Sequence, residues 1–282
     1  MKILITGTNG FIGRNLKEYF QDKDDVFAPK RQELDLLDSE AVYAYLEKGR
    51  FDAVIHCAVT ITSVEQTLKM YFNVERGLRF IGKMICVGSA AEYDMRHYVP
   101  MMKEDRFGTH IPTDVYGFAK YVIAKDIESN PRNIYNLRVF GIYGKYEDTR
   151  RRFITNNICK ALCGFNLSIN KNMYFDYLYI DDFTQIVDRF LRKEPREKSY
   201  NICTGQKVDL LTLAQTIKSI DGNNLSVIVK EEGFKPEYSG NNGLFLQEFG
   251  GFNFTPPSKA IDELYRWYNN PKNITLDPKN YE

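Results

Sequence analysis

The stretch Lys2-Ile-Leu-Ile-Thr-Gly7-Thr-Asn-Gly10-Phe-Ile-Gly13-Arg-Asn-Leu-Lys-Glu-Tyr-Phe20 decides the fold. It indicates a short apolar strand, a turn with three glycines and a helix with apolar residues at helical spacing. Gly7 permits the tight turn, Gly10 lets the backbone approach a pyrophosphate, and Gly13 lets the helix pack close to the strand. We therefore predict a dinucleotide-binding unit in which Asn9, Phe11 and Ile12 also lie beside the cofactor; a purely structural strand–helix turn is the alternative.

Strands and helices alternate after this unit. Apolar runs predict strands at residues 25–28, 52–59, 83–89 and 134–140, with a helix capped by Ser39 and a short helix that begins at Asn73. This order predicts an α/β fold with a doubly wound parallel sheet. We expect a dinucleotide-binding Rossmann domain over residues 1–165 and a smaller C-terminal α/β substrate-binding domain over residues 166–282. The chain is expected to cross between them.

The second strand decides which dinucleotide is expected. An acidic residue after this strand would bond the ribose 2′-hydroxyl of NAD, but the sequence continues Pro29-Lys30-Arg31. Two cations at this point suit a 2′-phosphate and therefore favour NADP(H) over NAD(H). A solvated basic loop is the alternative explanation of Lys30 and Arg31.

Composition excludes several classes of function. The net charge is +1 over 282 residues, which gives no reason to expect nucleic acid or an anionic membrane as a partner. No signal peptide and no membrane span are expected, so we predict a cytoplasmic protein. Cys159 and Cys163 lie four residues apart without a further Cys/His pair nearby, so we expect reduced core thiols and no metal site.

Tyr116 and Lys120 form the candidate catalytic pair. On a helix they lie one turn apart on the same face, where the ammonium group favours the phenolate form of the tyrosine. Y-x-x-x-K also occurs at Tyr19/Lys23, Tyr121/Lys125 and Tyr268/Lys272, so the pattern alone is weak. Only Tyr116 is expected to begin a helix between two sheet strands, at the carboxyl edge where Ser89 ends another strand. Ligands bind along that edge in such folds.

These residues together resemble a known family. Gly7-x-x-Gly10-x-x-Gly13, Ser89 and Tyr116-x-x-x-Lys120 are similar to the motifs of the extended short-chain dehydrogenase/reductases of the NAD-dependent epimerase/dehydratase type. Further matches lie at residues 137–144, 175–182, 199–205 and 255–268. The resemblance therefore runs from end to end, and it is nearest to GDP-fucose synthase-like nucleotide-sugar 4-keto reductases.

The resemblance implies roles for individual residues. Tyr116 would be the general acid/base, Lys120 would hold the nicotinamide ribose, and Ser89 would bond the reacting sugar oxygen. Asp35 and Leu36 would border the adenine, and Cys57 and Ala58 would also contact the cofactor. The substrate would meet a set of residues from both halves of the chain, namely Ser89, Ala90, Gly141, Arg151 and Arg152.

Two sets of family residues are absent, and their absence limits the reactions that we expect. Family dehydratases carry an Asp/Glu pair where this chain has Ala90 and Ala91. Epimerising reductases carry a cysteine at the position of Ala91 and a histidine in the stretch that here reads Arg150-Arg-Arg-Phe153. We therefore expect an enzyme of surface-polysaccharide synthesis that reduces a nucleotide-linked 4-keto-6-deoxy sugar with NADPH. The alternatives are an NAD-dependent nucleotide-sugar 4-epimerase and a non-catalytic dinucleotide-binding sensor or scaffold.

Some positions depart from the family pattern. Gly141 stands where the family has Asn, and Phe175 stands where it has Arg; both would normally lie near the sugar nucleotide. A compensating phosphate clamp could come from residues 150–152, with a solvated basic loop as the alternative. The helix expected at Asn73 is shorter than the family's corresponding helix, which usually helps form the dimer, and this puts a homodimer in doubt.

Overall fold

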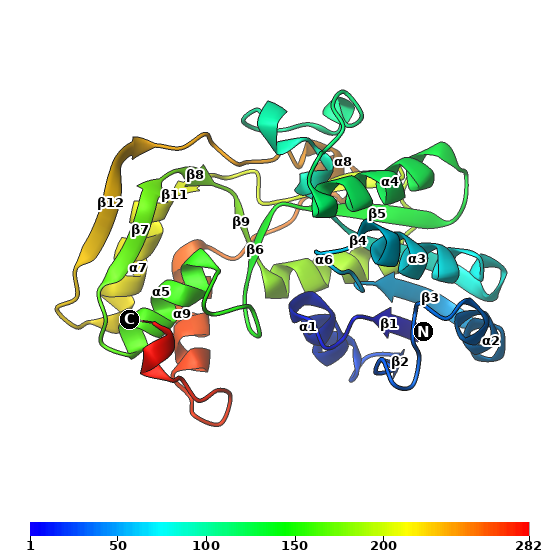
Figure 1. Ribbon diagram of the computed structural model, residues 1–282, viewed down its shortest axis with the longest axis horizontal. Helices are drawn as coiled ribbons and strands as arrows, with labels where there is room; N and C mark the ends of the chain where they lie inside the picture. The colour runs from blue at the N-terminus through cyan, green and yellow to red at the C-terminus, as the bar shows by residue number, and fades with distance from the viewer. Residues whose placement is uncertain (282) are drawn as a thin grey trace.

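A six-stranded parallel sheet organises the N-terminal part of the computed structural model, which describes residues 1–281 (Figure 1). Its strand order is β10-β5-β4-β3-β1-β2, so the chain winds outward in both directions from β1. This confirms the predicted doubly wound α/β fold. The strands are β1 Lys2–Thr6, β2 Asp25–Phe27, β3 Phe51–His56, β4 Ile81–Ser89, β5 Ile134–Val139 and β10 Ser199–Ile202.

Helices cover both faces of the sheet. Alternate strand residues point to opposite faces, so Ile3 and Ile5 join one core cluster and Leu4 joins the other. The first cluster packs against α1 (Phe11–Phe20) and α6 (Ile180–Arg192), and the second against α2 (Ser39–Gly49), α3 (Val64–Glu75) and α4 (Val115–Ser129). Both faces of the strands are therefore buried, which explains their continuous apolar sequences.

Two predicted helix starts are wrong. α3 begins at Val64 with Ser63 as its cap, so Asn73 lies near its end; the Asn73 side chain instead donates to the Leu36 carbonyl oxygen at 2.8 Å. At 12 residues α3 is not short, and the sequence-based doubt about a homodimer loses its premise. Ser39 is the first residue of α2, and Asp38 caps it by accepting hydrogen bonds from two backbone N–H groups.

A smaller C-terminal part packs beside the sheet (Figure 1). It contains a parallel pair of strands, β7 (Leu167–Asn172) and β12 (Val227–Phe234). This pair is packed with α5 (Phe153–Leu162), α7 (Leu210–Asp221) and α9 (Pro257–Tyr268). α6 and β10 lie beyond residue 165 yet pack with the N-terminal sheet, so the chain crosses between the parts and the division near residue 165 stays a proposal. The remaining elements are α8 Gly243–Phe249, β6 Gly141–Tyr143, β8 Tyr174–Phe175, β9 Tyr177–Tyr179, β11 Val208–Asp209, and the 3₁₀ helices Leu78–Phe80, Ala90–Glu92, Met95–His97, Glu104–Arg106 and Pro278–Asn280.

Residues 1–281 contain neither a candidate membrane span nor a candidate metal cluster. None of the helices in this range is long and apolar enough to cross a bilayer. No group of three or more His, Cys, Asp or Glu side chains there could hold a metal ion. All five cysteines are free thiols, and Cys86, Cys159 and Cys203 are buried.

Candidate active site

The glycine turn has the geometry of a phosphate-binding loop. Gly7 adopts φ of +72°, and a Cβ there would lie 2.7 Å from the Ala58 backbone nitrogen, so only glycine fits without strain. A Cβ at Gly13 would lie 2.4 Å from the Gly7 carbonyl oxygen, which explains the close packing of α1 on the turn. At Gly10 the same Cβ would meet only the Gly7 oxygen, at 3.3 Å, so the backbone is otherwise open to a ligand. The turn therefore fits a pyrophosphate at the start of α1.

Thr6, which belongs to none of the predicted motifs, stabilises this turn. The Thr6 hydroxyl accepts hydrogen bonds from the backbone N–H groups of Cys57 and Ala58, at 3.2 and 3.3 Å. It therefore donates its own proton to His56 Nδ1, at 3.1 Å. Burial, with a smaller effect from the nearby Lys120 charge, lowers the pKa of His56 to about 3, so the ring is neutral. His56 thus lies next to the glycine turn as a neutral ring that is hydrogen-bonded to Thr6.

A cavity of about 230 Å³ opens beside the turn on the β2 side. Its lining includes residues predicted to contact the cofactor, namely Gly7, Asn9, Arg31, Asp35, Leu36 and Ala58. The Arg31 guanidinium lies 3.6 Å from the Asp35 carboxylate and remains largely exposed. Lys30 is exposed and is not part of the lining. Arg31 is therefore the cation placed to meet a group at the adenosine end.

A second cavity, of about 870 Å³, contains the predicted catalytic residues. Ser89 is the last residue of β4, and Tyr116 is the second residue of α4, whose first turn is capped by the Asp114 carboxylate. Lys120 follows one turn later, nearly buried, and donates to the Val87 carbonyl oxygen at 2.6 Å. All three line this cavity, as do Phe11, Ile12 and Cys57 from the cofactor side.

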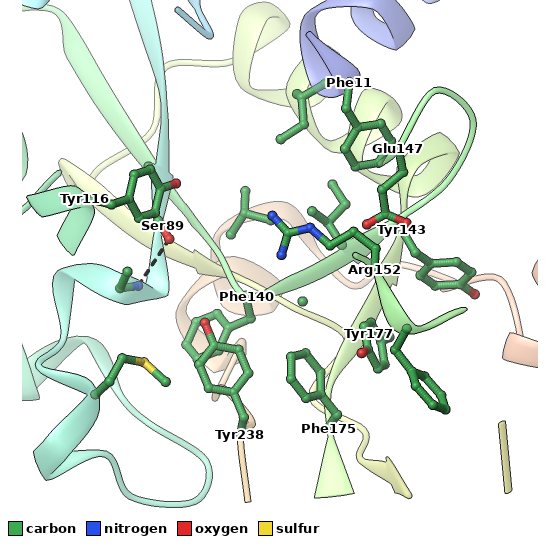
Figure 2. Close-up of a pocket in the computed structure, with 18 of the residues that line it drawn as sticks. Phe11, Ser89, Tyr116, Phe140, Tyr143, Glu147, Arg152, Phe175, Tyr177 and Tyr238 are labelled. Carbon is green, nitrogen blue, oxygen red and sulfur yellow. Dashed lines mark hydrogen bonds between the residues drawn. The ribbon is translucent and has the colours of Figure 1, made fainter. Parts of the chain in front are cut away.

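Arg152 extends into the cavity from the opposite wall (Figure 2). Its guanidinium group forms no hydrogen bond or ion pair with another described residue, so its five donors are free. The carboxyl group of Glu147 lies behind it, buried, and accepts a hydrogen bond from the Thr155 hydroxyl. Burial raises the pKa of Glu147 to about 8. Arg152 is thus a free cation next to a carboxyl group that is mostly protonated at neutral pH.

Aromatic rings form the floor of the cavity (Figure 2). Phe175 stacks on Tyr177 with ring centroids 4.2 Å apart and packs against Tyr238 at 4.7 Å. Tyr238 in turn stacks on Tyr98 at 4.8 Å, and Phe140 lies 5.7 Å from Tyr238. This ring cluster occupies the side of the cavity where Phe175 stands in place of the family's arginine.

Two further sequence-predicted residues, Ala90 and Arg151, lie outside this cavity, and a third, Gly141, lines it. Ala90 is fully buried in a core cluster with Tyr93 and Met102, whereas its neighbour Ala91 lines the cavity. Arg151 is 79% exposed and lies 3.7 Å from the Asp148 carboxylate, outside the lining. Gly141 lines the cavity as predicted.

Several lining residues carried no sequence signal. They come from connecting segments that the topology folds over the site, and include Tyr98, Glu147, Lys235 and Tyr238. Residues 235–238 follow β12, more than 100 residues after Tyr116 in the chain. An isolated β-bridge pairs Tyr238 with Phe175, and no local pattern predicts this pairing.

Known proteins resemble this chain over most of its length. The chain is 24% identical to GDP-6-deoxy-D-talose 4-dehydrogenase of Aggregatibacter actinomycetemcomitans over 94% of this chain and 97% of that protein. It is 21% identical to GDP-L-colitose synthase of Yersinia pseudotuberculosis over 97% and 99% of the two chains. The crystal structure of a GDP-D-glycero-L-gluco-heptose synthase from Campylobacter jejuni, in the presence of NADPH, has the same fold, with a TM-score of 0.82 and 18% identity over 95% of this chain and 98% of that one.

The family assignment rests on a separate match to a defined family. Residues 3–203, which include the glycine turn, Ser89, Tyr116 and Lys120, match the family described as NAD dependent epimerase/dehydratase. This range covers more than half of the chain and confirms the resemblance predicted from the motifs. The chain belongs to the NAD dependent epimerase/dehydratase family.

Proposed function

We propose that this protein is an NADPH-dependent oxidoreductase that reduces carbon 4 of a nucleotide-diphosphate 4-keto-6-deoxy sugar. The observation that carries the proposal is that Ser89, Tyr116 and Lys120 line a single cavity beside the glycine turn. The names of the two relatives, a GDP-sugar 4-dehydrogenase and a GDP-sugar synthase, support a sugar nucleotide as substrate.

The dinucleotide would lie along both cavities. Gly7, Asn9 and Gly13 would hold its pyrophosphate, while Arg31 would face a 2′-phosphate at the adenosine end. When bound, it supplies the hydride for carbon 4. The proposed preference for NADPH depends on Arg31 as the ligand of the 2′-phosphate, because Lys30 does not line the smaller cavity.

Tyr116 and Ser89 would act on the substrate oxygen. Tyr116 donates the phenolic proton to the oxygen that becomes the new hydroxyl group. The Ser89 hydroxyl accepts from the Ala91 N–H at 3.1 Å and donates to no described residue, so its proton is available to the same oxygen. Lys120 has two N–H donors left after its bond to Val87, enough to hold a ribose hydroxyl and stabilise the phenolate.

Proton transfer at other sugar carbons has less support. Ala91 lines the cavity where a dehydratase or an epimerising reductase would need an acid or a thiol. Two carboxyl groups line the cavity, and both already have partners. Glu147 accepts a hydrogen bond from Thr155, and Glu237 is paired with Lys207 at 2.5 Å. Tyr116 is therefore the proton donor best placed for carbonyl chemistry.

The substrate diphosphate needs a cation. Phe175 cannot supply one, and Arg152 is the lining residue with a free guanidinium group; Lys235 lines the same cavity. A guanidinium can bind phosphate through two parallel hydrogen bonds. We infer that Arg152 holds the diphosphate, with Lys235 as a second cation.

The test is an assay of NADPH and NADH oxidation against CDP-, GDP-, dTDP- and UDP-linked 4-keto sugars. Oxidation of NADPH with at least one of them supports the proposal. A 4-epimerase would instead retain tightly bound NAD and need no added reductant, and a sensor or scaffold would bind dinucleotide without turnover. The full length of α3 leaves a homodimer possible, and sedimentation of the same preparation would measure it.

A further inference from the structure

A buried charged pair lies directly beneath Ser89. Glu92 is 1% exposed and closes the short 3₁₀ helix that begins after Ser89. One of its carboxylate oxygens accepts the Ser89 backbone N–H at 2.9 Å. The other accepts from Arg138 Nε at 2.6 Å and from the Asn136 side chain at 2.8 Å. Both oxygens are thus used, one toward Ser89 and one toward β5.

Arg138 is itself fully buried and held from several sides. Its Nη2 donates to Glu128 at 2.5 Å, and its guanidinium carbon lies 4.0 Å from the centre of the Phe107 ring. Burial lowers the pKa of Arg138, but the combined effects of Glu92, Tyr93 and Glu128 outweigh it and raise the pKa overall, so the side chain is charged. Taking a carboxylate and a guanidinium out of water is costly, and such pairs often contribute little to stability.

The position of the pair suggests what it does instead. Neither Glu92 nor Arg138 lines the cavity, so neither touches a substrate there. Glu92 holds the Ser89 backbone while the Ala91 N–H holds the Ser89 Oγ at 3.1 Å. These two contacts hold both the backbone and the side chain of Ser89. The hydroxyl proton of Ser89 then points away from the acceptor groups of the protein.

We propose that Glu92, held by Arg138 and Asn136, is a positioning residue that sets the Ser89 hydroxyl for hydrogen bonding to the reacting oxygen. The effect that we expect on turnover rests on the proposed function. The effect that we expect on the position of Ser89 does not. Small displacements of a donor aimed at a developing oxyanion reduce turnover strongly, because the bond matters most in the transition state.

The test compares Glu92→Gln with Glu128→Gln. Both substitutions remove a carboxylate from Arg138, but only Glu92 reaches Ser89. The Gln side chain has one acceptor oxygen, and its nitrogen only donates. It therefore cannot replace both carboxylate oxygens as acceptors for Ser89 and Arg138, so one contact is lost. We expect Glu92→Gln to lower kcat about 10- to 100-fold, with KM changed by less than about 3-fold. Glu128→Gln is expected to stay within about 2-fold of the native kcat.

Equal losses of kcat in the two variants would mean a merely structural pair and would overturn the inference. If Glu92→Gln does not fold, the double variant Glu92→Leu/Arg138→Met removes both charges with apolar groups of similar length. It should fold and still have a low kcat; native turnover in it also overturns the inference.

Crystal structures give a readout that needs no substrate. The contact between Ser89 Oγ and the Ala91 N–H should be lost in Glu92→Gln and kept in Glu128→Gln. An unchanged Ser89 in Glu92→Gln overturns the inference even if no 4-keto sugar is reduced. Absence of turnover in the native protein, with Ser89 displaced in Glu92→Gln, would instead count against the proposed function alone.

Discussion

A Cβ atom on Gly141 would lie 2.2 Å from a ring carbon of Phe175. The two positions where this chain departs from the family's Asn and Arg are therefore one packing unit. The Phe175 ring occupies the space above Gly141 and stacks on Tyr177, which pairs with Gly141 between β6 and β9. The aromatic floor of the cavity thus depends on a glycine, because an Asn at position 141 would clash with the Phe175 ring.

The first prediction follows from this packing. Gly141→Asn should lower the free energy of unfolding by about 1–3 kcal/mol, the usual cost of overpacking. Adding Phe175→Ala should recover part of that loss, because the Asp176 carbonyl oxygen, 2.5 Å from the same Cβ position, still crowds it. Urea denaturation of the two single variants and the double variant measures the coupling.

Gly222→Asn is the matched control for that series. Gly222 adopts φ of +76° at the end of α7, and a Cβ there meets no atom within 4 Å. Asn tolerates this conformation, so its stability should stay within about 0.5 kcal/mol of native. Additive losses at Gly141 and Phe175, with no recovery in the double variant, would contradict the packing unit.

The second prediction concerns the proposed acid. Tyr116→Phe should lower kcat at least about 100-fold, because it removes the proton donor and leaves the ring in place. Its affinity for NADPH, measured by fluorescence titration, should be retained. Tyr121→Phe on the same helix is the control, since Tyr121 also precedes a lysine by four residues but does not line the cavity. Near-native turnover of Tyr116→Phe rejects the role of Tyr116.

Local sequence patterns predicted the parts of the structure that local chemistry determines. The parallel strands follow from apolar runs, and the glycine turn from backbone space that only glycine allows at Gly7. Ser89 and Tyr116 could be placed together because carboxyl ends of parallel strands share one edge. Helix starts were less predictable: a helix was expected to begin at Asn73, but this residue lies near the end of α3 and forms a tertiary hydrogen bond to Leu36.

The opposite wall of the cavity could not be predicted in the same way. Arg151 and Arg152 are neighbours with identical chemistry, yet only Arg152 lines the cavity, because the turn before α5 directs the two side chains differently. Tyr238 reaches Phe175 through long-range chain crossing. Contacts between segments far apart in sequence leave no periodicity or spacing for a local pattern to detect.

The two arginines supply the third prediction. Arg152→Ala should raise KM for the sugar nucleotide about 10- to 100-fold, because a hydrogen bond to a charged group is worth about 1.5–3 kcal/mol. NADPH affinity should be unchanged. Arg151→Ala, which removes an exposed side chain paired with Asp148, should leave KM within about 2-fold. Steady-state kinetics on both variants decide the point, and equal effects would favour a diffuse basic loop over a phosphate clamp.

The fourth prediction addresses cofactor choice. Arg31→Ala should lower the ratio of kcat/KM for NADPH to that for NADH by about 10-fold or more, because the guanidinium is the lining cation at the adenosine end. Lys30→Ala should have a smaller effect, since Lys30 lies outside the lining. A native preference for NADH would refute the use of Arg31 as a 2′-phosphate ligand.

The fifth prediction uses the pH dependence of stability. Burial raises the pKa of Glu147 to about 8, whereas the unfolded chain ionises near the ordinary value of 4.5. Between these values the folded state binds the extra proton, so the free energy of unfolding should fall as pH rises. The loss is a few kcal/mol at most, since one pKa unit is worth about 1.4 kcal/mol.

Glu147→Gln keeps a partner for Thr155 but cannot ionise. Its stability relative to the native protein should therefore increase between pH 5 and about pH 8.5, measured by urea denaturation at each pH. Glu263→Gln, at an exposed position of α9, should follow the native curve. Parallel curves for the native protein and Glu147→Gln would mean that Glu147 is already ionised at pH 7. In that case Arg152 would face a carboxylate, and the cavity would offer the substrate diphosphate a partly neutralised cation.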